Sequence, residues 1–113
     1  MDRAEYFGRG KRLVVSAFAV LNPRQARTYV LATPDATTKV VVLVTPQVVN
    51  FLREGPWFTL FNEGPGSIAV IKAGGQLVGT LAPNEVGDVV LWDRNEPLGS
   101  WILTKRTFVT GGI

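Results

Sequence analysis

Two pairs of carboxylates are the side chains whose spacing could support acid–base chemistry or bind a cation. Glu85 lies near Asp88 in the sequence, and Asp93 lies near Glu96. Glycosidic hydrolysis uses two carboxyl groups roughly 5–9 Å apart, one of them in an environment that raises its pKa. A calcium loop needs more oxygen ligands than either pair supplies. Because acidic residues at strand ends can come this close by chance, we interpret both pairs as solvated strand ends.

Residue types on which many enzymes and metal sites depend are missing. The chain of 113 residues contains no cysteine and no histidine. Disulfides, thiolate or imidazole metal ligands, cysteine nucleophiles and histidine-containing triads are therefore excluded. The glycine-rich segments 64–66 and 74–75 do not open a predicted helix and lack the Gly-Lys-Ser/Thr ending of a phosphate loop, so they predict turns. We expect a protein that is not an enzyme and that binds no cofactor and no metal.

Three tryptophans could stack on sugar rings or on nucleobases. Trp92 follows Val-Val-Leu and Trp101 precedes Ile-Leu, so both lie in apolar sequence. We predict that Trp57, Trp92 and Trp101, together with Phe58 and Phe108, lie in the core or at a subunit interface. A sheet that binds single-stranded nucleic acid alternates aromatic residues with Lys or Arg, whereas the middle of this chain has few basic residues. We therefore expect no nucleic-acid partner.

Basic residues are concentrated near the N-terminus. Residues 1–27 contain six basic and two acidic residues, whereas residues 28–113 contain six basic and seven acidic ones. We predict a basic arm over residues 1–12, followed by a single β domain over residues 13–113. A solvated, partly mobile terminus is the alternative. The partner-binding residues that we assign to the arm are Arg3, Arg9, Lys11 and Arg12 for electrostatic contacts and Tyr6 and Phe7 as anchors.

The composition indicates a surplus of apolar surface. Hydrophobic residues make up 46% of the chain and charged residues 19%, against about 25% charged in ordinary globular domains. Such a surplus usually serves a subunit interface, so we expect a homo-oligomer; a large core or a β-rich bias is the alternative. No apolar run approaches the 18 or so residues that span a bilayer, and we expect no membrane partner.

The elements that position these residues are predicted to be short strands. Valine, isoleucine and threonine account for 30 of the 113 residues, which favours β structure. Strands are predicted, between Gly, Pro, Asn or Asp residues, at Leu13–Val20, Arg27–Ala32, Lys39–Thr45, Trp57–Asn62, Ser67–Lys72, Gln76–Leu81, Glu85–Asp93 and Trp101–Thr104, with Thr107–Thr110 as a ninth candidate. Their regular spacing predicts an all-β fold, an antiparallel β-sandwich, jelly-roll-like or small barrel of about eight strands.

Two local features complete this prediction. Residues 46–55 begin with Pro, carry apolar residues at a spacing of three and four, and end with Gly, which predicts one short helical turn; an irregular loop is the alternative. Residues 57–71 place two β-rich runs on either side of Glu63–Ser67, which predicts a hairpin. The segments 73–75 and 82–84 predict further turns in an antiparallel meander.

The second half of the chain carries three turn-and-strand motifs. Residues 55–64 match G-x-x-F-x-L-x-N-x-G, and residues 79–86 match G-x-L-x-P-G-E, with Asn84 in place of the last glycine. Residues 89–93 and 99–103 loosely match a closing D-G-x-x-W strand pair. Together these motifs, which cover under half of the chain, resemble the small β domains of virion proteins of tailed bacteriophages.

The resemblance implies a structural role. In that family such domains serve as capsid decoration or cement proteins, often as homotrimers, which bridge major capsid protein subunits or other virion subunits and stabilise the shell. It implies a location on the capsid surface of the virion after synthesis in the host cytoplasm. The alternative is a tail-fibre module or a module that binds carbohydrate or a host receptor. Such a module would expose a tryptophan in a shallow groove beside carboxylates or amides.

Overall fold

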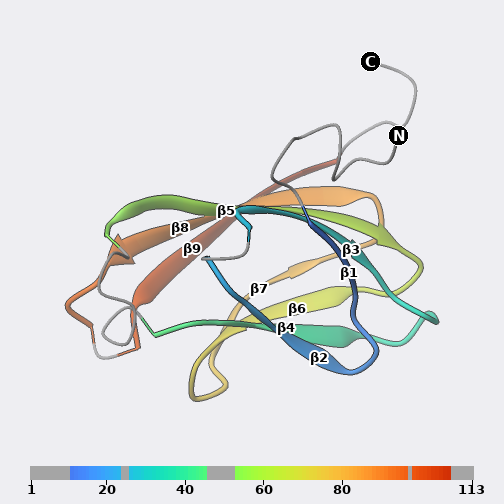
Figure 1. The fold of residues 1–113 in the computed structure, drawn as a ribbon, viewed down its shortest axis with the longest axis horizontal. Coiled ribbons are helices and arrows are strands. Elements are labelled where there is room, and N and C mark those ends of the chain that lie inside the picture. The colour runs from blue at the N-terminus through green and yellow to red at the C-terminus, as the bar shows by residue number, and fades with distance from the viewer. Residues whose placement is uncertain (1–10, 24–25, 46–52, 97, 108–113) are drawn as a thin grey trace.

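The structure, a computed structural model, describes residues 11–23, 26–45, 53–96 and 98–107. Nine strands form two sheets that face each other, and no helix occurs among these residues (Figure 1). The strands are β1 (Lys11–Val14), β2 (Phe18–Leu21), β3 (Thr28–Ala32), β4 (Lys39–Leu43), β5 (Gly55–Gly64), β6 (Ile68–Lys72), β7 (Leu77–Leu81), β8 (Glu85–Asp93) and β9 (Ser100–Thr107).

Both sheets mix parallel and antiparallel strands. The five-stranded sheet has the order β1-β3-β5-β8-β9, and the four-stranded sheet has the order β2-β4-β6-β7. Strands β1, β3 and β5 run parallel to one another, as do β2, β4 and β6, whereas β7, β8 and β9 pair antiparallel with their neighbours. The predicted antiparallel sandwich, jelly roll or barrel is therefore wrong: the described chain is all-β but forms two open mixed sheets and no closed barrel.

The reason for this pairing is that the chain changes sheet after each of the first five strands. A parallel pair needs a long crossover connection, and here the crossover from one strand to its parallel neighbour is a strand of the opposite sheet. Successive strands about ten residues apart can be joined by hairpins or can cross between sheets. The sequence spacing therefore fits both hairpins within one sheet and crossings between two sheets. The prediction of hairpins throughout is wrong, because the first five strands are joined by crossings.

Two of the predicted elements show this difference directly. The predicted strand Leu13–Val20 is divided between β1 and β2, which lie in opposite sheets. At the break, the backbone N–H of Val15 donates to the carbonyl of Ala32 (2.8 Å), whereas the carbonyl of Ala17 accepts from Val40 (3.1 Å). The predicted hairpin over residues 57–71 is also wrong, because β5 and β6 lie in different sheets.

Other local predictions agree with the structure. Strands β6 and β7 form an antiparallel pair around the turn at residues 73–75, and β8 pairs antiparallel with β9. Asn84 has a positive φ of 68°, as its place in the motif of a glycine-containing turn predicts. The predicted helical turn over residues 46–55 falls mostly on residues 46–52, which lie outside the described residues, and Gly55 begins β5.

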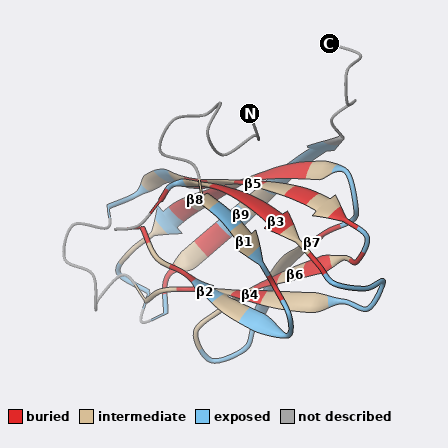
Figure 2. Ribbon diagram, turned by 45° about the vertical axis from the view of Figure 1, so that its right-hand side comes forward, coloured by how far each residue is buried: buried red, intermediate tan, exposed pale blue. Residues whose placement is uncertain are grey.

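The core lies between the two sheets (Figure 2). Alternate residues of each strand point inward, including Tyr29, Phe58 and Leu60 from the larger sheet and Leu43 and Val70 from the smaller one, each at most 1% exposed. The rings of Tyr29 and Phe58 lie 6.1 Å apart at an angle of 51°, a tilted contact that aromatic pairs favour.

One fully buried polar side chain, Asn62, joins the turns at one end of the sandwich. Its Nδ2 donates to the carbonyls of Gly66 and Leu81, both at 3.0 Å, and its Oδ1 accepts from the backbone N–H of Gly64 at 2.8 Å. The positive φ of Gly64, 77°, allows the chain to fold back over this amide. The Asn and Gly of the first sequence motif therefore have a structural role.

Candidate functional site

The structure describes two residues of the predicted basic arm. Lys11 and Arg12 belong to β1, so the boundary predicted after residue 12 falls inside a strand. The guanidinium of Arg12 forms an ion pair with Glu63 on β5, with 2.7 Å between Nη2 and Oε1. Arg3, Tyr6, Phe7 and Arg9 lie outside the described residues. Their predicted contacts with a partner stay predictions.

Four of the five aromatic residues predicted to lie in the core or at a subunit interface are among the described residues, and they occupy three environments. Phe58 is 1% and Trp101 is 8% exposed, and both belong to the core. Trp57 is half-buried against the core. Trp92 is 68% exposed, because it follows the buried Leu91 in β8 and points away from the core. Phe108 lies outside the described residues.

The four carboxylates singled out from the sequence lie on β8 or in the connection that follows it, and three of them have hydrogen-bond partners. Glu85 accepts from the N–H of Ala82 in the preceding turn (2.7 Å), and Asp93 accepts from the N–H of Asn95 (2.9 Å). Asp88 accepts from the Thr59 hydroxyl at 3.0 Å and pairs with Arg106 at 3.0 Å. Among the described residues, no three acidic side chains are grouped to hold a metal ion. These three carboxylates therefore form hydrogen bonds within the turns and the sheet.

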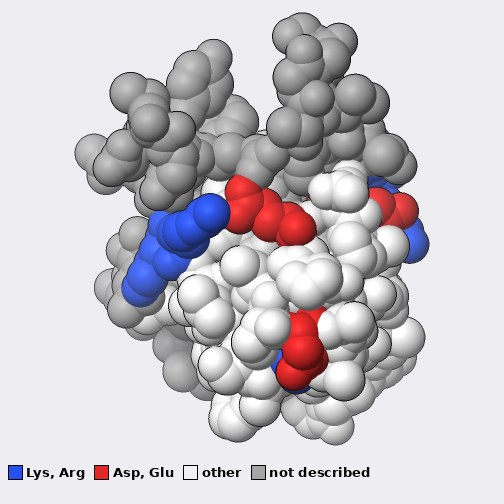
Figure 3. Space-filling view, turned by 90° about the vertical axis from the view of Figure 1, so that its right-hand side faces the viewer, with Lys and Arg blue, Asp and Glu red and all other residues white. Residues whose placement is uncertain are grey.

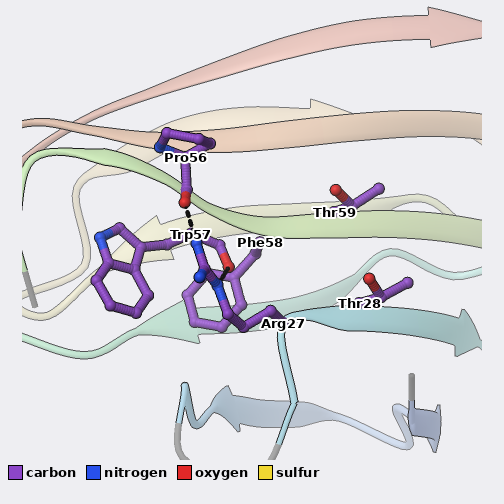
Figure 4. A pocket seen from close by; sticks show the side chains of 6 residues that line it. All are labelled: Arg27, Thr28, Pro56, Trp57, Phe58 and Thr59. Carbon is purple, nitrogen blue, oxygen red and sulfur yellow. Dashed lines mark hydrogen bonds between the residues drawn. The ribbon is translucent and has the colours of Figure 1, made fainter. Parts of the chain in front are cut away.

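A pocket of about 320 Å³ lies where β3 and β5 begin. It is lined by Arg27, Thr28, Pro56, Trp57, Phe58 and Thr59 (Figure 4). The Arg27 guanidinium lies 4.4 Å from the centre of the Trp57 ring, a cation–π contact. Its Nε donates to the carbonyl of Trp57 at 3.1 Å, and its Nη2 donates to the carbonyl of Pro56.

Through these contacts Arg27 holds the first residues of β5 in place. The ladder between β5 and β8 shifts register between Pro56 and Phe58, and Arg27 binds two carbonyls at this irregularity. One face of the Trp57 indole is covered by the guanidinium, so that face is closed to a sugar ring. The remaining polar lining is the hydroxyl pair of Thr28 and Thr59, which are register partners on adjacent strands.

The outward side of the four-stranded sheet is apolar, and we call it the outer apolar face. Backbone register places its side chains in two rows across β2, β4, β6 and β7: Phe18, Val40, Ala69 and Thr80 in one row, and Val20, Val42, Ile71 and Leu77 in the other. Phe18 is 69%, Val20 54% and Leu77 58% exposed. The other five are half-buried, and none of the eight carries a charge.

Sequence reasoning predicted a surplus of apolar surface but did not find this face. The signal was in β4, Lys-Val-Val-Val-Leu, and in β6, Ile-Ala-Val-Ile-Lys, which are apolar at consecutive positions instead of alternating. Continuous apolar runs are typical of parallel strands that are covered on both sides. Here only the inner side is covered within the described chain.

The described charged side chains lie outside the outer apolar face. At the end of the sandwich that lies at the right of Figure 1, the described charges form small separate groups on a mostly uncharged surface (Figure 3). In the loop between β3 and β4, the hydroxyl and the backbone N–H of Thr37 donate to Asp35 and, with Lys39 nearby, lower the pKa of that carboxyl to about 2. Hydrogen bonding by the N–H of Arg94 likewise lowers the pKa of Glu54.

No family model, no curated protein and no solved structure matches this chain. Within the described residues, no helix is both long enough and apolar enough to cross a membrane. Function is therefore inferred from the residues and from the geometry of the two sheets.

Proposed function

We propose that this protein is a non-enzymatic structural subunit of a virion, of the capsid decoration type. The observation that carries the proposal is the outer apolar face, a whole sheet surface that bears no charge. Large exposed apolar patches mark interaction sites, and protein surfaces that avoid association usually carry charges on exposed strands. An assembly subunit needs such a surface, whereas a freely diffusing enzyme gains nothing from it.

The basic arm provides attachment to the shell in this proposal. Guanidinium and ammonium groups of residues 1–12 pair with acidic groups on the major capsid protein or on other virion subunits. Arg12 contributes less than Arg9, because its guanidinium already pairs with Glu63. The resemblance of residues 55–104 to phage virion domains supports the same role, although the Asn62 and Asn84 motifs within it serve the turns of the fold.

Attachment is tested on particles purified from a culture that produces the chain. We expect the chain to co-purify with the particles, and purified chain to rebind to particles from which it has been removed. Replacing Arg9 and Arg12 with Glu should abolish rebinding, because both charges are reversed. The matched control replaces Lys105 and Arg106, on β9, with Glu. Absence of the chain from purified particles, or full occupancy by the Arg9/Arg12 variant, would contradict the proposal.

A second candidate function, binding of carbohydrate or of a host receptor, is favoured by Trp92. This side chain is 68% exposed on β8, at the end of the larger sheet where the Arg27 pocket also lies. An exposed indole offers a flat apolar face on which a sugar ring can stack and an N–H that can donate to it. Binding of oligosaccharides measured by calorimetry, lost in Trp92→Ala and kept in Trp57→Phe, would support this function. It would then replace attachment to the shell as the protein's role.

A further inference from the structure

No contact among the described residues covers the outer apolar face. Its two rows run over all four strands, from Phe18 and Val20 on β2 to Thr80 and Leu77 on β7. With three side chains exposed as given above and five half-buried, the face presents on the order of 450 Å², comparable to the largest apolar patch on an ordinary monomer. An apolar partner surface would complement it.

Three lysines lie near the margins of this face, and one of them, Lys105 of β9, donates to the carbonyl of Thr80 at the β7 edge (3.0 Å). The ammonium of Lys39 is 3.1 Å from Asp35 in the β3–β4 loop, and the ammonium of Lys72 donates to the carbonyl of Gly99 at 3.0 Å. Lys39 and Lys72 sit at strand ends, and both are drawn towards other parts of the chain. A partner recognised by charge would find no complementary group among the eight side chains of the face.

We infer that the outer apolar face packs against the same face of a second copy of this chain around a two-fold axis. Each copy then contributes an identical surface, as in any two-fold interface. Complete coverage of two such faces buries at most on the order of 900 Å², slightly below the roughly 1,000 Å² of a stable specific interface. This size predicts a reversible dimer, not a permanent one.

The position of Ala69 suits contact between two copies whose two-fold axis passes through the centre of the face. Ala69 is its smallest side chain and lies on the central strand β6. A two-fold axis parallel to the strands places Ala69 opposite Val40 of the second copy, and an axis perpendicular to the strands places it opposite Ile71. In both arrangements a small side chain meets a larger one, which is how facing sheets interdigitate.

The inference rests on the proposed function, because it names the partner of the surface that carries it, but the two can fail separately. A dimer that never attaches to particles would overturn the proposed function and leave the inference standing. A chain that attaches to particles and remains monomeric in solution would do the reverse. The homotrimer implied by the resemblance to phage proteins needs a contact between two different surfaces, so a trimeric mass would overturn the two-fold inference.

Sedimentation of the full chain between about 1 and 200 μM tests the inference. We expect a monomer–dimer equilibrium that high salt does not weaken, because no charge contributes to the contact. Leu77→Lys should raise the dimer dissociation constant at least tenfold. Trp92→Lys is the matched control, since Trp92 is an apolar side chain of similar exposure on the other sheet (68% against 58% for Leu77), and it should leave the constant unchanged.

A monomer at every concentration would overturn the inference, and so would a dimer that Trp92→Lys breaks and Leu77→Lys does not. A second measurement covers the case in which Leu77→Lys fails to fold. The chain has no cysteine, so Leu77→Cys introduces a single thiol. Its reaction with a maleimide should slow several-fold as the concentration of the chain rises through the dimer range. A rate that does not depend on concentration would also overturn the inference.

Discussion

Removal of the buried amide at Asn62 should strongly destabilise the protein. The side chain is fully buried and forms three hydrogen bonds, two to carbonyls and one from a backbone N–H. Asn62→Ala leaves these three backbone groups buried without their partner, and each such group costs about 1–3 kcal/mol. Allowing for partial relaxation, we expect a loss of about 4 kcal/mol in the free energy of unfolding, out of the roughly 5–15 kcal/mol typical of a domain.

Urea unfolding followed by tryptophan fluorescence measures this loss. The matched control is Asn95→Ala, since Asn95 is exposed and its described hydrogen bond is made by its backbone N–H, which alanine keeps. The control should change stability by less than about 0.5 kcal/mol. A loss below about 1 kcal/mol for Asn62→Ala would show that the amide does not hold the turns together, and the structural interpretation of the sequence motif would be wrong.

Three further predictions follow from the described contacts. Trp101→Ala should cost about 3–5 kcal/mol in unfolding free energy, because Trp101 is a core residue, whereas the exposed Trp92→Ala should cost less than about 1 kcal/mol; equal losses in urea unfolding would contradict this division. Gly66→Ala should lower the melting temperature by about 10 °C, because an added Cβ would lie 2.4 Å from a backbone carbonyl oxygen of the β3–β4 loop; an unchanged calorimetric melting curve would refute it. The lowered pKa of Asp35, about 2, contributes stability above the pKa of the unfolded carboxyl, near 3.8, and this contribution is lost as the pH falls towards 2. Thr37→Ala should therefore raise the pKa of Asp35 in an NMR titration, and an unchanged pKa would contradict the assigned cause.

Strand positions were predicted well from the sequence. The predicted Glu85–Asp93 coincides with β8, and Arg27–Ala32 and Lys39–Thr45 differ from β3 and β4 by one or two residues at one end. Gly, Pro, Asn and Asp mark the ends of these strands in the sequence, because these residues favour the backbone conformations of turns. Strand positions depend on local chemistry, and the sequence is informative about that.

Strand partners could not be predicted in the same way. Whether the chain turns back into the same sheet or crosses to the other depends on which residues distant in the sequence complete the core. Val15, at the break between β1 and β2, is fully buried, so the predicted strand Leu13–Val20 looked continuous although its halves belong to opposite sheets. Of the two predicted locations for Trp92, the core is wrong and a subunit interface stays a prediction. Val89 and Leu91 are buried, and Trp92, the next residue of β8 after Leu91, points to the opposite side of the sheet.

The order in which the strands are synthesised bears on how the protein folds. Only β6–β7 and β8–β9 are pairs of consecutive strands, so these C-terminal hairpins are the only local pairings among the described strands. The parallel pairs, β1–β3, β2–β4, β3–β5 and β4–β6, join residues 18 to 32 positions apart, and distant pairings of this kind slow folding. On the ribosome, β1 to β4 emerge first but lack the central strand β5 and its neighbour β8, so we expect the larger sheet to assemble only after most of the chain has been released.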